Sequence, residues 1–145
     1  MNDDFAPFEL AVKLKEKGFD EECLAYYTSE HTLYTNKVVL CDDKYLEVAE
    51  IDYEECLRSY NTQKDRLLRT IVDAPTISQV LKWLREKYFI HISTKPYPCE
   101  DGIMWLYETR KFNEYRSVVV ANKTGFIKEE KAALAGIKCV LDNLI

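Results

Sequence analysis

Two histidines and five cysteines are the side chains of this 145-residue chain best suited to bind zinc, and they are also candidate catalytic residues. A structural zinc site needs about four such ligands at short, defined spacings. His91 lies in an alternating apolar segment, and no histidine or cysteine stands at ligand spacing from it. His31 follows Ser29 and Glu30, but neighbours along one turn rarely reach the geometry of a catalytic triad, and the chain has no G-x-S-x-G motif. We therefore expect no metal and no catalytic residue.

Three other motifs resemble reactive groups without meeting their requirements. The tripeptide Lys123-Thr124-Gly125 lacks the preceding glycines whose amides surround a phosphate. A reactive thiolate needs positive charge nearby, and the residues that follow Cys99 are acidic. Adjacent glutamates, such as those at 54–55 and 129–130, point in different directions on regular elements and make poor acid–base pairs. The sequence thus predicts no enzyme and no cofactor.

Aromatic side chains are frequent, with 10 Tyr, 6 Phe and 2 Trp. Trp105 and Tyr107 share one face of an expected strand, and Trp83 lies beside the apolar stripe of an expected helix. Such rings can fill a small core, form a protein-binding surface, or stack on bases. Trp105, Tyr107 and Trp83 are the candidate interaction surface, for a protein partner or for self-association.

Basic side chains are concentrated in the second half of the chain. Residues 75–145 carry 11 basic and 8 acidic side chains, whereas residues 1–74 carry 9 basic and 17 acidic ones. A polyanion-binding surface is therefore expected only in the second half. The candidate contacts to RNA or DNA are Lys95, Arg116, Lys123, Lys128 and Lys131.

The densest run of acidic residues lies between Asp42 and Glu55, a segment with seven carboxylates and a single basic residue, Lys44. A run of this kind is typical of a solvated connector, which we place at about residues 41–62. The other interpretation is an acidic strip that repels nucleic acid or mimics its charge.

The elements of the first half follow from punctuation and residue type. Pro7 and Gly18 suit the two ends of a helix over residues 8–17. Residues 23–28 and 32–40, rich in Tyr, Thr, Leu and Val, predict a strand pair around residues 29–31. A short helix near residues 53–60 and a strand over residues 67–72 are also expected.

The second half shows clearer periodicity. Apolar residues at helical spacing predict a helix from the N-cap Thr76 to Tyr88, with Ile77, Val80, Leu81 and Leu84 on its stripe. Strands are expected over residues 89–93, 103–110 and 115–121, with a loop at Pro96, Pro98 and Gly102. A last helix over residues 128–144 places Leu134, Ile137, Leu141 and Leu144 inward.

These elements predict the fold class. Residues 76–145 have the order helix–strand–strand–strand–helix, and the short links between the strands favour an antiparallel sheet with helices packed on one face, an α+β fold. A length of 145 residues suits a single domain over residues 1–145. No apolar run reaches membrane-span length, and the acidic start is unlike a secretion signal. The odd number of cysteines favours reduced thiols, so we expect a cytoplasmic protein without disulfides.

Residues 74–87, with the sequence APTISQVLKWLREK, and the Ile90-His91-Ile92 that follows resemble a signature of small uncharacterised proteins carried by bacterial prophages and mobile elements. Residues 8–19, 105–108 and 135–145 are similar to the same group. The resemblance implies an accessory protein of a mobile element. It implies no catalytic residues, because the group has no established activity.

The order helix–three strands–helix is also similar to the double-stranded RNA-binding domain, and Lys128 and Lys131 are similar to the basic start of that family's last helix. That family reads RNA through 2′-hydroxyl and phosphate contacts, so the resemblance implies RNA binding. The chain departs from the family at Glu129 and Glu130, which oppose a phosphate at the helix start. The loop over residues 95–102 also lacks the family's histidine.

We therefore expect a non-enzymatic accessory or interaction protein of a bacterial mobile element or prophage, which binds a protein partner or a second copy of itself and no membrane. The alternative is an RNA- or DNA-binding module that uses the helix–three strands–helix unit.

Overall fold

The computed structural model describes residues 4–28, 30–35 and 72–145. The chain divides into two compact units, one formed by Met1–Ala6 with Thr76–Ile145 and the other by Pro7–Pro75. Whether both belong to one folding domain stays a prediction. The expected connector at 41–62, the expected helix at 53–60 and most of the strand at 67–72 lie outside the described residues.

The unit formed by Pro7–Pro75 begins with the expected helix, α1 (Phe8–Glu16). Its buried stripe consists of Leu10, Ala11 and Leu14. The helix ends at Glu16, and Gly18, with a φ of 84°, turns the chain so that the Phe19 N–H donates to the Leu14 carbonyl at 2.9 Å. A positive φ at this position favours glycine, which explains the stop that the sequence predicted.

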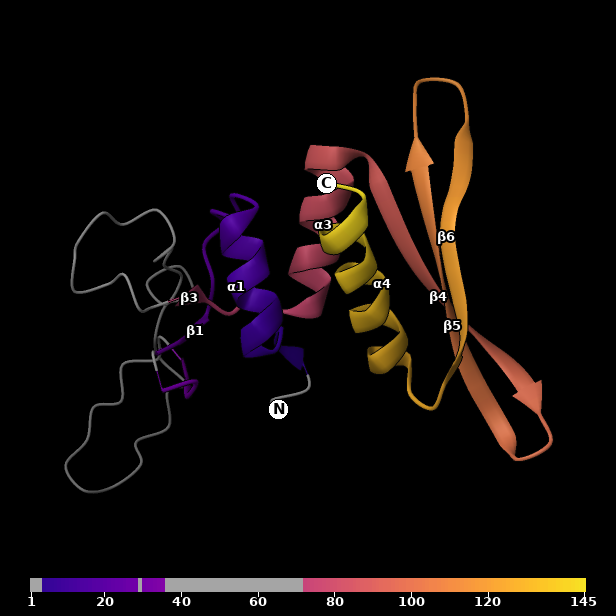
Figure 1. The fold of residues 1–145 in the computed structure, drawn as a ribbon, viewed down its shortest axis with the longest axis horizontal. Helices are drawn as coiled ribbons and strands as arrows, with labels where there is room; N and C mark the ends of the chain where they lie inside the picture. The colour runs from indigo at the N-terminus through magenta and orange to yellow at the C-terminus, as the bar shows by residue number, and fades with distance from the viewer. Residues whose placement is uncertain (1–3, 29, 36–71) are drawn as a thin grey trace, which may run out of the picture. The chain divides into compact units, whose positions relative to one another are not determined.

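A small antiparallel sheet in the order β2-β1-β3 completes this unit (Figure 1). It consists of β1 (Ala25–Tyr27), β2 (Leu33–Thr35) and β3 (Val72–Asp73). Tyr26 pairs with Tyr34 across β1 and β2, which confirms a strand pair around residues 29–31. Residues 36–40 of the expected second strand lie outside the described residues.

The other unit begins with α3 (Ile77–Tyr88), where the Gln79 N–H donates to Thr76 Oγ1 at 3.2 Å, as expected of an N-cap. Val80 and Leu84 are buried as predicted, and Trp83 joins them. Ile77 and Leu81 are only half-buried. The helix therefore turns a face centred between Val80 and Trp83 into the core.

Three antiparallel strands follow in the order β4-β5-β6: β4 (Ile90–Cys99), β5 (Gly102–Phe112) and β6 (Ser117–Phe126). The loop expected at Pro96 and Pro98 is wrong, because β4 runs through both prolines to Cys99. As an edge strand, β4 needs no outward N–H, so proline is tolerated there. Strand β6 also runs five residues beyond its expected end, with register shifts near Val120 and Thr124.

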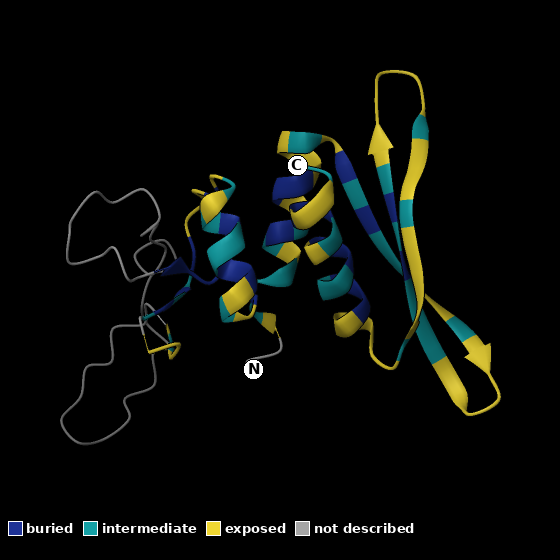
Figure 2. Ribbon diagram, in the orientation of Figure 1, coloured by how far each residue is buried: buried dark blue, intermediate teal, exposed yellow. Residues whose placement is uncertain are grey.

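Helix α4 (Glu129–Asn143) packs across all three strands, and α3 packs on α4 and β4, so both helices cover one face of the sheet (Figures 1 and 2). This confirms the predicted α+β class and the helix–strand–strand–strand–helix order. The buried stripe of α4 includes Ile137 and Leu141 as predicted. Leu134 and Leu144 are only half-buried, because the small residues Ala132, Ala133 and Gly136 face the sheet instead.

Candidate interaction surface

The aromatic residues named from the sequence contribute mainly to the core. Trp83 is 4% exposed and Tyr107 is 5% exposed, while Trp105, on the helix-covered face with Tyr107, is half-buried. Burial raises the pKa of the Tyr107 hydroxyl, and its hydrogen bond with Cys139 raises it further. The Tyr107 ring also lies 5.9 Å from that of Phe126. The expectation of an exposed aromatic face is therefore corrected for Trp83 and Tyr107, which leave almost no area for a partner.

The basic residues named for nucleic-acid binding do not gather on one surface. Lys128 and Lys131 lie together at the start of α4, whereas Arg116 lies in the β5–β6 turn. The ten residues of β6 lie between these places, a span of about 33 Å. Lys123 is exposed on β6. Lys95 lies on the sheet face opposite to that of Lys123, and its Nζ is 3.9 Å from the Glu108 carboxylate.

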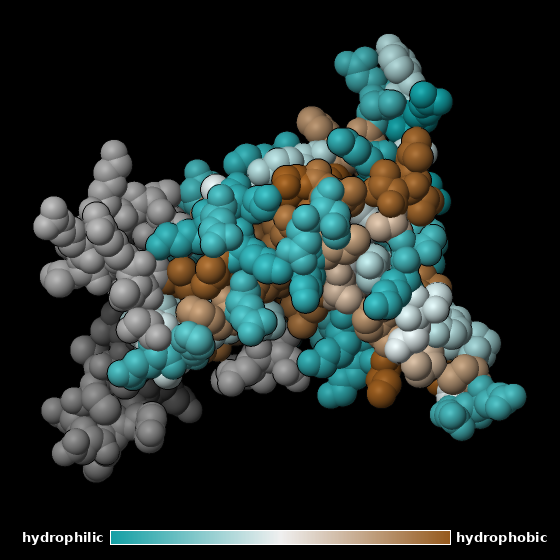
Figure 3. Space-filling view, in the orientation of Figure 1, coloured by the Kyte–Doolittle hydropathy of each residue, from teal (hydrophilic) through white to brown (hydrophobic). Residues whose placement is uncertain are grey.

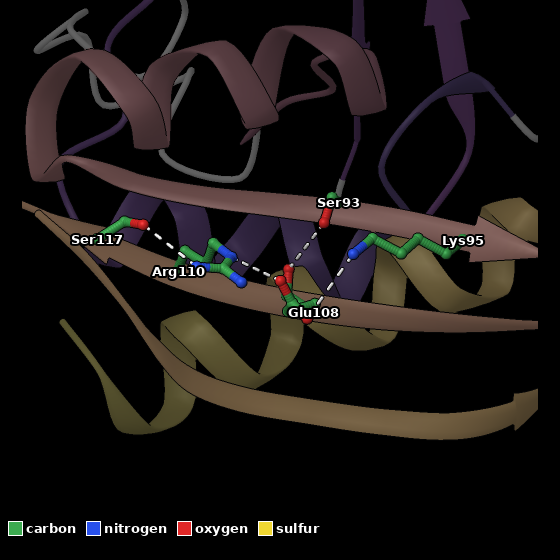
Figure 4. Close-up of polar contacts among 5 residues, drawn as sticks. All are labelled: Ser93, Lys95, Glu108, Arg110 and Ser117. Carbon is green, nitrogen blue, oxygen red and sulfur yellow. Dashed lines mark hydrogen bonds and ion pairs between the residues drawn. The ribbon is translucent and has the colours of Figure 1, made fainter.

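The middle of the open sheet face is occupied by a polar network centred on Glu108 (Figure 4). Arg110 Nε donates to Glu108 Oε1 at 2.6 Å, and Arg110 Nη1 donates to Ser117 Oγ at 3.2 Å. The hydrogen bond from Arg110 lowers the pKa of the Glu108 carboxyl, with partial burial opposing it. These side chains bind one another, so this strip offers few unused polar groups to a ligand.

Exposed apolar side chains are concentrated instead at the end of the β5–β6 hairpin. Among the described residues nine large hydrophobic side chains are exposed, and five of them lie within residues 112–120, a segment we call the apolar arm. They are Phe112, Tyr115, Val118, Val119 and Val120, with Tyr115 at 91% the most exposed. The tip of the hairpin extends past the ends of α3 and α4, and hydrophobic side chains gather over β6 there (Figures 1 and 3).

The turn of the apolar arm is held by a single side chain. Asn113 Oδ1 accepts hydrogen bonds from the N–H groups of Tyr115 and Arg116, at 3.1 and 3.0 Å. The Asn113 N–H also donates to the Arg116 carbonyl at 3.0 Å. An asparagine that binds the backbone two residues ahead stabilises a tight turn. The arm is therefore preorganised, which lowers the entropic cost of docking it.

A shallow pocket of about 320 Å³ lies at the base of the arm and is lined by Arg85, Phe89, His91 and Phe112. Phe89 is the C-cap of α3: its φ of 56° ends the helix, its N–H donates to the Leu84 carbonyl, and the residue is 63% exposed. Because the Phe112 N–H donates to the Phe89 carbonyl at 2.9 Å, the pocket is continuous with the arm.

The apolar arm was not predicted, although the sequence contains a signal for it. Successive side chains of a strand point to opposite faces, so three consecutive valines at 118–120 place apolar groups on both faces. A sheet with helices on one face leaves at least one of those valines exposed. Tyr115, expected inside the third strand, lies in the turn instead, since β6 begins at Ser117.

In the described parts of the chain no three His, Cys, Asp or Glu side chains converge as metal ligands would. None of the helices there is long and apolar enough to cross a membrane. Comparison of the chain with protein-family models, with curated proteins and with solved structures finds no match.

Proposed function

We propose that the chain is a non-enzymatic accessory protein of a bacterial mobile element or prophage, and that it binds a protein through the apolar arm. The observation that carries this proposal is the clustering of exposed apolar side chains on residues 112–120. An exposed apolar cluster costs free energy in water, and proteins that keep one usually cover it with a partner.

The composition of the arm supports a protein as the partner. Tyrosine is enriched at binding surfaces, where its ring supplies a large contact area at little cost in side-chain entropy. Valine is branched at Cβ and therefore restricted at χ1, so these side chains likewise lose little entropy on docking. The assignment to a mobile element rests on the resemblance of residues 8–19 and 74–87 described above.

Site-specific photo-crosslinking in the source organism tests the proposal. A photoreactive amino acid at Tyr115 is expected to give a protein adduct of defined mass, and V120K in the same chain is expected to abolish it. The matched control is Ile103, which is 66% exposed at the opposite end of β5. No adduct at Tyr115, or the same adducts from Ile103, would contradict the proposal.

The alternative, an RNA- or DNA-binding module, stays a prediction with weaker support, since its basic residues lie at opposite ends and on both faces of the sheet. Phosphate contacts are strongest at low salt, so fluorescence anisotropy with labelled duplexes at low ionic strength decides this point. The proposed function expects no binding. Tight binding that weakens in K128A and K131A would favour the alternative.

A further inference from the structure

The outer edge of β6 has unpaired peptide groups along its apolar segment. The hydrogen bond from the Asn113 N–H to the Arg116 carbonyl identifies these two residues as a hydrogen-bonded pair of the ladder. Bonded and non-bonded pairs alternate along an antiparallel ladder. Ser117, opposite Phe112, and Val119, opposite Arg110, are therefore in non-bonded pairs. Their N–H and carbonyl groups point away from β5, where the described residues include no further strand.

The direction of the Phe112 N–H supports this alternation. It donates to the Phe89 carbonyl, on the β4 side of β5, and so points away from Ser117. The register is also continuous from Ser117 to Val119, and the first shift comes only after Val119. This straight segment is the part of β6 best suited to receive another strand.

We propose, as a refinement that rests on the proposed function, that the partner is a second copy of this chain, joined by antiparallel pairing of β6 with β6 about a two-fold axis at Val118. In this register Ser117 of each copy lies opposite Val119 of the other. The N–H and carbonyl groups of both residues point away from β5, so the two Ser117–Val119 pairs exchange four N–H···O=C hydrogen bonds. The two Val118 side chains, each 51% exposed, meet at the axis as a non-bonded pair, where side chains approach most closely.

The charges of the arm fit this arrangement. The segment from Ser117 to Asn122 carries no charge, so the axis is neutral. The two Lys123 side chains lie ten residue positions apart, about 33 Å. The two Arg116 residues are four positions apart, about 13 Å, which exceeds the screening length of about 8 Å at physiological salt.

The other edge of the sheet explains why the assembly stops at two copies. Edge β4 contains Pro96 and Pro98, which have no N–H to donate and protect that edge from pairing. A pairing that uses the same edge on both copies is two-fold symmetric and leaves no second equivalent edge. Strands β4, β5 and β6 of the two copies then form one continuous six-stranded sheet. The assembly is a closed dimer rather than a filament.

Sedimentation velocity of the full chain tests the pairing over concentrations from low micromolar to several hundred micromolar. We expect a monomer–dimer equilibrium in the wild type. V119P removes the outward N–H without touching the β5 ladder, and V118K places two like charges at the axis, so both variants should remain monomeric. I103K, which charges an exposed apolar site outside the arm, is the matched control and should dimerise like the wild type.

The register is tested by mixing charged variants. V118K and V118E should each be monomeric alone and should form a heterodimer when mixed, because residue 118 faces residue 118. A wild type that stays monomeric at every concentration, or a dimer unaffected by V118K, would overturn the pairing. A Tyr115 adduct in cells to a different polypeptide, together with a monomeric chain, would leave the proposed function standing and reject only the second copy as partner.

Discussion

At the scale of single residues, two neighbouring polar side chains of the β4-β5-β6 sheet differ in whether their polar atoms are hydrogen-bonded. Among the described residues, Thr109 Oγ1 is a fully buried side-chain oxygen with no hydrogen-bond partner. Glu108, next to it on the open face, binds Arg110, and its carbonyl lies 3.5 Å from the Ser93 hydroxyl. Neighbouring strand residues point to opposite faces, which explains how one is buried without a partner and the other is satisfied.

We expect T109V to stabilise the protein by about 1 kcal/mol, because the substitution keeps the shape of the side chain and removes a buried hydroxyl that makes no hydrogen bond. The urea midpoint measures the change. The matched control is T94V, since the Thr94 hydroxyl donates to Glu129 Oε1 at 2.9 Å and its removal brings no gain. Equal midpoint shifts in both variants would rule out this explanation.

Glu108 makes stability depend on pH. Its pKa is lowered in the folded state, chiefly by the hydrogen bond from Arg110, so the folded state favours the carboxylate. This contribution is complete above the ordinary glutamate pKa of about 4.3 and is lost as the pH falls through the lower folded value. We expect E108Q to be less stable than the wild type at about pH 7, and we expect the difference to shrink as the pH falls below the ordinary glutamate pKa.

Urea midpoints of the wild type and E108Q across this range provide the measurement. E100Q, in the exposed β4–β5 turn, is the control, since its side chain makes none of the contacts of the Glu108 network. A difference between E108Q and the wild type that persists unchanged to low pH would show that the charge of Glu108 is not the cause.

At the scale of elements, the distance between α4 and the sheet is set by Gly136. A Cβ at this position would lie 2.8 Å from Ile92 Cγ2 and 3.2 Å from the Tyr107 ring. These neighbours are buried branched or ring atoms with little room to move. The absence of a side chain thus lets the helix approach β4 and β5 closely.

We expect G136A to destabilise the protein by about 1–3 kcal/mol through overpacking, although alanine is the better helix former by about 1 kcal/mol. K138A, an exposed position on the same helix, should change the stability by less than about 0.5 kcal/mol. Chemical denaturation of both variants provides the comparison. A G136A protein as stable as the wild type would mean that α4 has room to move away from the sheet.

At the scale of the whole molecule, the chain forms two compact units, and the prediction of a single folding domain concerns whether they unfold together. Both tryptophans, Trp83 and Trp105, belong to the unit formed by Met1–Ala6 with Thr76–Ile145. Tryptophan fluorescence therefore reports on that unit, whereas far-UV circular dichroism reports on the secondary structure of both units.

We expect the two signals to follow one transition in urea, as a single cooperative domain requires. G136A, which acts in only one unit, should then shift both transitions by the same amount. A fluorescence transition that moves with G136A while part of the circular dichroism transition stays in place would show two independently folding units and contradict the single-domain prediction.

The sequence by itself determined the α+β class, the order of elements in residues 76–145 and the ends of the helices, because these depend on local periodicity and on capping residues such as Thr76 and Gly18. Only the tertiary structure decided which apolar groups are covered. Trp83 and Tyr107 are buried and the valines at 118–120 are exposed, although all belong to apolar segments. Exposure depends on where α4 packs across the strands, and this packing arises from contacts between residues far apart in the chain.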